Sequence, residues 1–342
     1  MGRSTLTKRH FLKTAAAAAT TPLLVGVTRA AAQSMPVVTM QLGWLASNGI
    51  LGEVAAMANG YYDAEGVTLE ITPGGPNVDG VAGVAAGRAS LGQLSSSPSM
   101  MLARSAGIPV KAFAAGYQKH PFTYFSLEDA PIRTAQDMIG KTIATQPTAQ
   151  ILLKALLAAN EIPEDQVEVV NMGSDMNQLL TGQAQAVTGW LTNTNALSVL
   201  GESRVDLMLW DTGIQLYANV YYANDDTLAN EADTLAAFLR GSARGWGFAR
   251  ENPEAAVDML VAAYPNLDRD SELQAVETVL GFSFDGTTAE RGWGTMEADK
   301  WEAQIRTYAD LEQFTGDVPG LQDVMTTDIL ERTADVRMSV AA

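Results

Sequence analysis

The stretch "LGQLSSSPSMMLARSAGIPVKAFAAG", Leu91 to Gly116, decides the fold class. Its first apolar run predicts a short strand, the segment from Pro98 to Gly107 predicts a helix with proline in the first turn, and "VKAFAAG" predicts a second strand. A strand, a helix and a strand joined by short Gly- and Pro-containing connections are typical of a parallel sheet with helices on both faces. The sequence therefore predicts an α/β fold.

The same alternation extends in both directions from this stretch. Before it, we expect a strand at 37–44, a helix ending at Gly66 and a strand at 67–74. A second α/β set follows from Thr123 to about Trp210, and the chain from Glu231 onward predicts helices only. We expect these last helices to cover the first α/β set, after the chain crosses back through 217–225. The sequence thus predicts two lobes joined by two crossover segments that form a hinge.

The first residues of the chain resemble an export signal. A basic segment, "TKRHFLK" (Thr7 to Lys13), precedes a mild apolar run at 14–27 and the small residues "RAAAQ". We predict a signal peptide over residues 1–32, cleaved near Ala32. Its basic part resembles a twin-arginine signal with Lys8 in the first arginine position, so the general secretory route stays open. An uncleaved anchor is the alternative, although the run is short for a membrane span.

Composition excludes several classes of function. The formal net charge of −17 argues against nucleic acid and anionic membrane surfaces as partners. The absence of cysteine excludes disulfides and thiolate chemistry. Only His10 and His120 could supply imidazole, so we expect no metal site and no cofactor. We expect His120 to lie in a surface loop, and dinucleotide, phosphate-loop and nucleophile-elbow motifs are missing.

Several segments together resemble the solute-binding proteins of ABC importers, in the nitrate, taurine, sulfonate and pyrimidine-precursor class related to fungal thiamine-pyrimidine synthase. The resemblance covers nearly the whole chain after the signal, and its carriers are "LGWLASNGILGEVAAMANGYYDAEGVTLEITPGG", "GVAAGRASLGQLSSSPSMMLARSAGIPVKAFAA", "TAQDMIGKTIATQ" and "VEVVNMGSDMNQLLTGQAQAVTGWLTNTNAL". It implies a two-lobed, type II periplasmic-binding-protein fold with the C-terminal helices on the first lobe. We accordingly expect lobe 1 at 36–119 plus 221–342 and lobe 2 at 120–220.

The resemblance also implies partners and a location. The protein would be periplasmic and monomeric, would bind one small molecule between its lobes, and would deliver it to ABC permease and ATPase subunits. Without a lipid-anchored cysteine we expect no stable membrane insertion.

Candidate ligand-binding residues of lobe 1 follow its predicted strands. The resemblance places Trp44 where pyrimidine-binding relatives stack a tryptophan on the ring, and Asn48 near their asparagine. Gly75 lies in a "GGP" turn, which is equally consistent with a plain turn. Ser95, Ser96 and Ser97 lie where a strand ends and a helix begins, so they offer donors to a polar solute, and one of them would be the N-cap.

The opposing wall would come from lobe 2 and the crossovers. Those candidates are Gln146, Thr148, Trp190, Asn193, Asn195, Tyr117 and Tyr221, with core or hinge packing as the alternative for the tyrosines. Pyrimidine binders carry a glutamate near the position of Asn195, and this chain has amides and hydroxyls there instead, which puts an aminopyrimidine ligand in doubt.

These residues favour a binding protein over an enzyme. No arginine falls in the candidate segments. We therefore prefer the interpretation that tryptophan stacks on a small heterocyclic or aromatic solute that is pyrimidine-like in size. An alkanesulfonate, taurine or nitrate held by helix termini and hydroxyls is the alternative. A thiamine-pyrimidine-synthase-like enzyme and a sensor receptor are alternatives of other classes.

Overall fold

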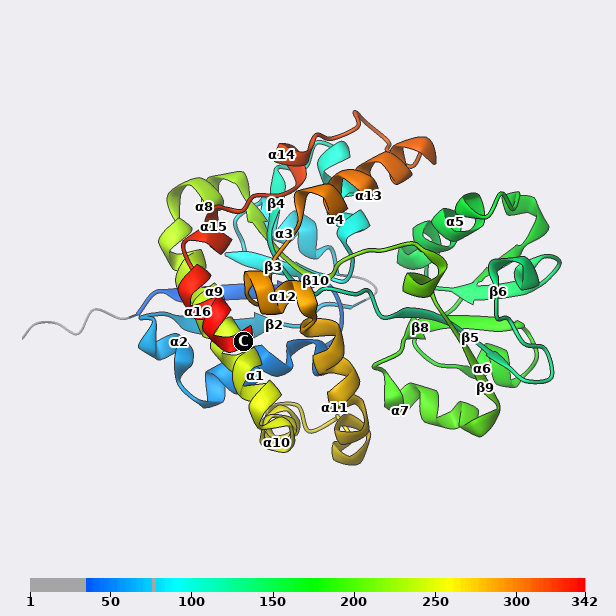
Figure 1. Ribbon diagram of the computed structural model, residues 1–342, viewed down its shortest axis with the longest axis horizontal. Coiled ribbons are helices and arrows are strands. Elements are labelled where there is room, and N and C mark those ends of the chain that lie inside the picture. Colours follow the sequence, from blue (N-terminus) through cyan, green and yellow to red (C-terminus); the bar gives the residue numbers. More distant parts are fainter. Residues whose placement is uncertain (1–34, 76–77, 342) are drawn as a thin grey trace, which may run out of the picture. The chain divides into compact units, whose positions relative to one another are not determined.

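The computed structural model describes residues 35–75 and 78–341 and contains two five-stranded sheets (Figure 1). The first sheet has, in spatial order, β2 (Thr68–Thr72), β1 (Val37–Leu42), β3 (Leu91–Leu94), β10 (Ala218–Asn224) and β4 (Val110–Tyr117). The second has β7 (Glu168–Asn171), β6 (Thr142–Thr145), β8 (Ala186–Trp190), β5 (Phe122–Leu127) and β9 (Arg204–Met208). The predicted α/β class with two sheets is confirmed.

Each sheet contains one antiparallel strand, which corrects the expectation of purely parallel sheets. β10 runs antiparallel to β3 and β4, and β5 runs antiparallel to β8 and β9. β5 receives the chain directly from β4 of the first sheet, and β10 receives it from β9 of the second. The segment 217–225, expected as a crossover, is therefore mostly strand β10, and the strand at β5 was not predicted.

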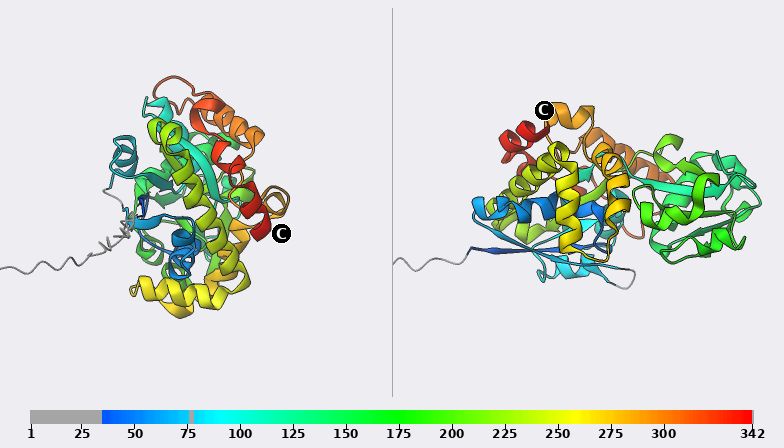
Figure 2. Two further views of the ribbon diagram at one scale, coloured as in Figure 1. Left: turned by 90° about the vertical axis from the view of Figure 1, so that its left-hand side faces the viewer. Right: turned by 90° about the horizontal axis from the view of Figure 1, so that it is seen from below.

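The helices of the N- and C-terminal parts of the chain surround the first sheet, on both of its faces (Figure 2). They are η1 (Asn48–Ile50), α1 (Leu51–Ala58), α2 (Tyr61–Ala64), α3 (Gly80–Ala85), α4 (Ser97–Ser105), α8 (Asp225–Asn230), α9 (Ala232–Glu251), α10 (Pro253–Ala263), α11 (Arg269–Ser283), α12 (Gly286–Arg291), α13 (Ala298–Asp310), α14 (Leu321–Val324), α15 (Asp328–Glu331) and α16 (Ala334–Ala341). The expected packing of the C-terminal helices on the first lobe is confirmed, since α11, α14 and α15 contact β4.

Close packing of α1 against α9 fixes the core of this part of the fold. A Cβ built on Gly245 would lie 1.9 Å from the carbonyl oxygen of Gly52, and one built on Gly52 would lie 2.2 Å from the Trp246 ring. Only glycine permits this approach of two helix backbones. The contact buries Trp246 completely, and its ring stacks on Trp293 at a centroid distance of 5.9 Å.

The second sheet carries shorter helices. They are η2 (Ala135–Met138), η3 (Pro147–Ala149), α5 (Gln150–Ala159), η4 (Glu164–Gln166), α6 (Asn177–Leu180), α7 (Thr194–Leu197), η5 (Ser198–Ser203) and η6 (Leu209–Thr212). α5 buries its leucines, and the predicted helix at 134–140 is only the 3-10 turn η2.

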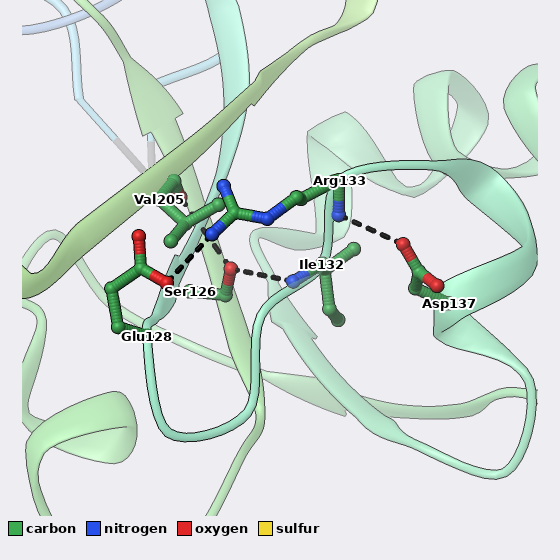
Figure 3. Close-up of polar contacts among 6 residues, drawn as sticks. All are labelled: Ser126, Glu128, Ile132, Arg133, Asp137 and Val205. Carbon is green, nitrogen blue, oxygen red and sulfur yellow. Dashed lines mark hydrogen bonds and ion pairs between the residues drawn. The ribbon is translucent and has the colours of Figure 1, made fainter.

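Side-chain hydrogen bonds hold the turn that leads from β5 into η2 (Figure 3). The Ser126 hydroxyl accepts the Ile132 N–H at 2.9 Å, and Arg133 pairs with Glu128 at 2.6 Å. The Asp137 carboxylate also accepts the Arg133 N–H at 3.0 Å and the Thr134 N–H at 2.9 Å, and the second bond belongs to a capping box formed by Thr134 and Asp137. Hydrogen bonds from these backbone amides lower the pKa of Asp137. The turn brings the chain back toward β6 without a long loop.

The predicted signal peptide, residues 1–32, lies outside the described residues. Within 35–75 and 78–341, no helix combines the length and hydrophobicity needed to span a membrane. The lobe boundaries at 119/120 and 220/221 remain a prediction; β5 begins at Phe122, and β10 already begins at Ala218.

Candidate functional site

The carboxyl ends of β2, β1 and β3 form one edge of the first sheet. These strands are parallel and adjacent, so the segments that follow them lie side by side. The Gly43 N–H donates to the Gln93 carbonyl at 2.8 Å, and the Gly74 N–H donates to the Trp44 carbonyl at 2.9 Å. In open α/β sheets ligands bind outside the carboxyl ends of strands. The structure thus brings Trp44 together with the turn at Gly74 and Gly75.

Glycine is required in that turn. A Cβ at Gly74 would lie 2.2 Å from the Leu42 carbonyl oxygen, and Gly75 has a φ of 153°. Both residues are buried, whereas the Trp44 ring beside them is half-buried. The turn therefore has a packing role that is sufficient to explain its two glycines.

The three serines after β3 have different environments. Ser97 is fully buried: its hydroxyl donates to Gln304 Oε1 at 2.5 Å and accepts the Tyr217 N–H at 3.1 Å. Ser96 occupies the N-cap of α4, but its hydroxyl contacts Ser99 Oγ at 3.0 Å and caps no backbone amide. Ser95 is half-buried. Of the three, Ser95 is the serine that remains partly open to a solute.

The corresponding edge of the second sheet is formed by the carboxyl ends of β7, β6 and β8, which are also parallel. Gln146 follows β6 and donates from Nε2 to the Gly173 carbonyl at 3.1 Å. Thr148, Asn193 and Asn195 are exposed, and Trp190, at the end of β8, is half-buried.

Hydrogen bonds join the two edges. Asn48, which is 7% exposed, donates from Nδ2 to the Thr192 carbonyl at 2.9 Å and to Glu272 Oε2 at 2.8 Å. The Thr194 hydroxyl donates to the Ser271 carbonyl at 2.7 Å. The segment after β1 and the segment after β8 are therefore in direct contact, with the first turns of α11 against both.

Glu272 was not singled out from the sequence. Burial raises the pKa of its carboxyl, and the hydrogen bond from Asn48 opposes that rise. Nothing in the local pattern of α11 distinguishes it from the exposed acidic residues nearby, because its burial depends on contacts with Asn48, 224 residues earlier in the chain.

An aromatic cluster lies where the first crossover passes the end of β8. The Trp190 ring lies 6.0 Å from the Tyr117 ring and 5.7 Å from the His120 ring, measured between centroids. Tyr117 is fully buried and also contacts Trp246 edge-on at 5.9 Å.

His120 is 1% exposed, so the expectation of a surface loop is wrong. Its Nδ1 accepts the Phe122 N–H at 3.2 Å. Burial lowers the pKa of the imidazole to about 3, against a smaller opposing effect of the nearby Ser95 backbone.

Tyr221 lies away from these residues, in the core between β10 and α1. It is fully buried, and its hydroxyl donates to the carboxylate of Glu53, a residue that the sequence did not single out. Trp246 Nε1 donates to the same carboxylate oxygen at 3.3 Å. Burial raises the pKa of Glu53 to about 7. These contacts make Tyr221 a core residue, which corresponds to the alternative of core packing given above for the tyrosines.

Two cavities occur elsewhere. One of about 360 Å³ lies between α13 and 213–216, and one of about 380 Å³ lies beside Ser90 and Asn224. Neither of these two cavities is lined by Trp44 or Trp190. No cluster of three or more potential metal ligands occurs in the part of the chain that the structure describes.

Comparison with known proteins identifies the family. Residues 47–256, more than half of the chain, match the model described as NMT1/THI5 like. The chain belongs to the NMT1/THI5-like family. The resemblance drawn from the sequence is thereby confirmed.

Two relatives match this family member over most of their length. A formylaminopyrimidine-binding protein of Halalkalibacterium halodurans is 24% identical over 80% of this chain and 84% of its own. The riboflavin-binding protein RibY of Chloroflexus aurantiacus is 25% identical over 82% of this chain and 84% of its own.

Solved structures establish the fold. The alkanesulfonate-binding protein SsuA of Xanthomonas axonopodis pv. citri, bound to MOPS, aligns with a TM-score of 0.63 at 15% identity, over 86% of this chain and 99% of that one. The desulfurization enzyme DSZB aligns with a TM-score of 0.58 at 15% identity, over 87% and 99%. The predicted two-lobed, type II periplasmic-binding-protein fold is confirmed, and the same fold serves an enzyme.

Proposed function

We propose that this chain is the solute-binding component of an ABC importer, and that it captures a small heterocyclic or aromatic solute between the carboxyl edges of its two sheets. The observation that carries the proposal is the contact of these edges: Asn48 bonds Thr192 across them, and the half-buried Trp190 lies at the same junction. Two α/β lobes that meet at such edges can close on a ligand by hinge motion.

Family membership supports the ligand class. Both relatives are named for nitrogen heterocycles, a formylaminopyrimidine and riboflavin. Trp44 and Trp190 supply flat apolar area, and Gln146, Asn193 and Ser95 supply neutral hydrogen-bonding groups. We assign the binding role to these residues together with Asn48, Thr148 and Asn195, and we assign no direct contact with the solute to the buried Gly75, Ser96 and Tyr117. Neutral donors around an indole suit an uncharged ring better than a small anion.

A sulfonate or nitrate-type anion is the second candidate, because SsuA with bound MOPS shares the fold. Its anionic group would rest on hydroxyls and on backbone amides near Ser95, since no arginine or lysine lies among the candidate residues. Charge neutralisation would be incomplete, which makes this candidate weaker.

An enzyme of the thiamine-pyrimidine-synthase type is weaker still. The chain has no cysteine, and burial holds the imidazole of His120 uncharged, so it is a poor general acid. Incubation with pyridoxal phosphate and iron, followed by mass spectrometry, tests this class: a newly formed pyrimidine would replace the binding proposal.

Ligand titration tests the binding proposal. Isothermal titration with formylaminopyrimidine, riboflavin, MOPS, taurine and nitrate should show binding of at least one heterocycle and weaker binding of the anions. Trp190→Ala should weaken heterocycle binding about ten-fold or more, as expected for a lost stacking contact. Trp210→Ala is the matched control, because Trp210 is also half-buried but lies in η6. Equal affinities for the two variants would contradict the assignment.

We further propose that the protein is exported, with lobes at 36–119 plus 221–342 and at 120–220. N-terminal sequencing of the protein recovered from the periplasm should give a chain that begins just after Ala32. Recovery of a chain beginning at Met1 in the cytoplasm would contradict export.

A further inference from the structure

His120 is one of several buried side chains with an unpaired polar atom, and its ring also contacts Trp190 of the candidate site. The side chain is 1% exposed, and within the described residues its Nε2 has no hydrogen-bond partner. A buried donor or acceptor left unpaired lowers the stability of the folded state. Such a group calls for an explanation, and a functional role is one of those known, beside strain and an ordered water or ion.

The tautomer of His120 follows from its other nitrogen. Nδ1 accepts the Phe122 N–H at 3.2 Å, so it carries no hydrogen. Burial lowers the pKa of the imidazole to about 3, so the ring is neutral near pH 7. A neutral imidazole with a bare Nδ1 must carry its hydrogen on Nε2. The unpaired atom is therefore a fixed hydrogen-bond donor.

The position of the ring relates this donor to the candidate site. The Trp190 ring, from the carboxyl end of β8, meets it at a centroid distance of 5.7 Å and an interplanar angle of 71°. The backbone of Ser95, from the carboxyl end of β3, acts on the imidazole as a weak hydrogen-bond acceptor that opposes the lowering of its pKa, but it does not meet hydrogen-bond geometry with Nε2. His120 thus lies beside a candidate residue from each of the two sheet edges.

We propose that His120 is a specificity-determining residue that donates from Nε2 to an acceptor atom of the bound solute. This inference rests on the proposed function and narrows its ligand class. A solute stacked near Trp190 would present a ring nitrogen or a carbonyl oxygen toward His120. Rings that present an N–H or an amino group there would be rejected, because two donors would face each other in a buried site.

A pair of variants separates the donor from the packing. His120→Phe keeps a flat ring beside Trp190 but removes both nitrogens, whereas His120→Gln places an amide N–H near the position of Nε2. Both variants lose the bond from the Phe122 N–H, so they share that structural cost. Binding of riboflavin and formylaminopyrimidine to the full chain is measured by titration. We expect about a ten-fold loss of affinity for His120→Phe and substantial recovery in His120→Gln, as for one hydrogen bond.

¹⁵N NMR of the imidazole reports the protonation and hydrogen bonding of His120, which a purely packing role would not change on ligand binding. The sequence has only two histidines, His10 and His120, and His10 lies in the predicted signal peptide, so the exported protein labelled with ¹⁵N-histidine gives one imidazole pattern; in the full chain, His120→Gln identifies which of the two patterns belongs to His120. We expect His120 to be neutral with its hydrogen on Nε2, and we expect that hydrogen to shift downfield when the heterocycle binds.

The outcomes separate the two proposals. If the wild-type protein binds neither heterocycle, both the proposed ligand class and this inference fall. If the wild-type protein binds a heterocycle but His120→Phe and His120→Gln have the same affinity for it as each other, only the inference about His120 is overturned. The same holds if the Nε2 hydrogen does not shift when the heterocycle binds.

Discussion

Replacement of Glu53 by glutamine should make the protein more stable at neutral and alkaline pH. Glu53 lies on α1, fully buried against β10 and α9. One carboxylate oxygen accepts hydrogen bonds from Tyr221 and Trp246, and the other has no partner among the described residues. Burying a carboxylate with incomplete pairing favours its protonated form. Glutamine reproduces the shape and the acceptor oxygen without the charge.

The magnitude follows from the pKa. Burial raises the pKa of Glu53 from an ordinary 4.5 to about 7 in the folded protein. The folded state therefore holds its proton more tightly than the unfolded state does. This contribution to stability is complete below about pH 4.5, is lost as the pH rises to about 7, and changes no further above that. At roughly 1.4 kcal/mol for each pH unit, the loss is about 3 kcal/mol.

The assay is urea denaturation followed by tryptophan fluorescence, for which Trp246 is a reporter next to the carboxyl. The free energy of unfolding of Glu53→Gln, relative to wild type, should rise by about 3 kcal/mol between pH 4 and pH 8. Glu70→Gln, which changes an exposed side chain on β2, should show no such rise. A relative stability of Glu53→Gln that is the same at both pH values would refute the argument.

Two further substitutions test the packing. Gly245→Ala should lower the melting temperature measured by calorimetry and cost about 3 kcal/mol or more, because its Cβ would collide with the Gly52 carbonyl oxygen. The control is Gly281→Ala on α11, where the added Cβ meets open space, and it should be neutral or slightly stabilising. Ser97→Ala should cost about 1–3 kcal/mol in chemical denaturation, because Gln304 loses its buried partner, while heterocycle affinity measured by titration changes less than three-fold. A large loss of affinity at unchanged stability would instead return Ser97 to the ligand-binding set.

The candidate site was only partly accessible from the sequence. Trp44 and Ser95 follow strands and Trp190 ends one, and the strand pattern together with the family resemblance was enough to single them out. The partner of Asn48 could not be found in this way, because Thr192 lies 144 residues away. His120 was misjudged, since a histidine beside a lysine and a proline reads as a loop unless the burial of its ring is known.

Local patterns determined the α/β class, the helical C-terminal region and the absence of cysteine chemistry, because helix and strand periodicity and composition are properties of neighbouring residues. Tertiary structure alone decided that β10 inserts between β3 and β4, and that Glu53 and His120 are removed from water. Strand order and burial depend on which distant segments come together. Once the environment of a titratable side chain is set by such segments, its pKa and hydrogen bonds follow from the packing and not from its neighbours in the chain.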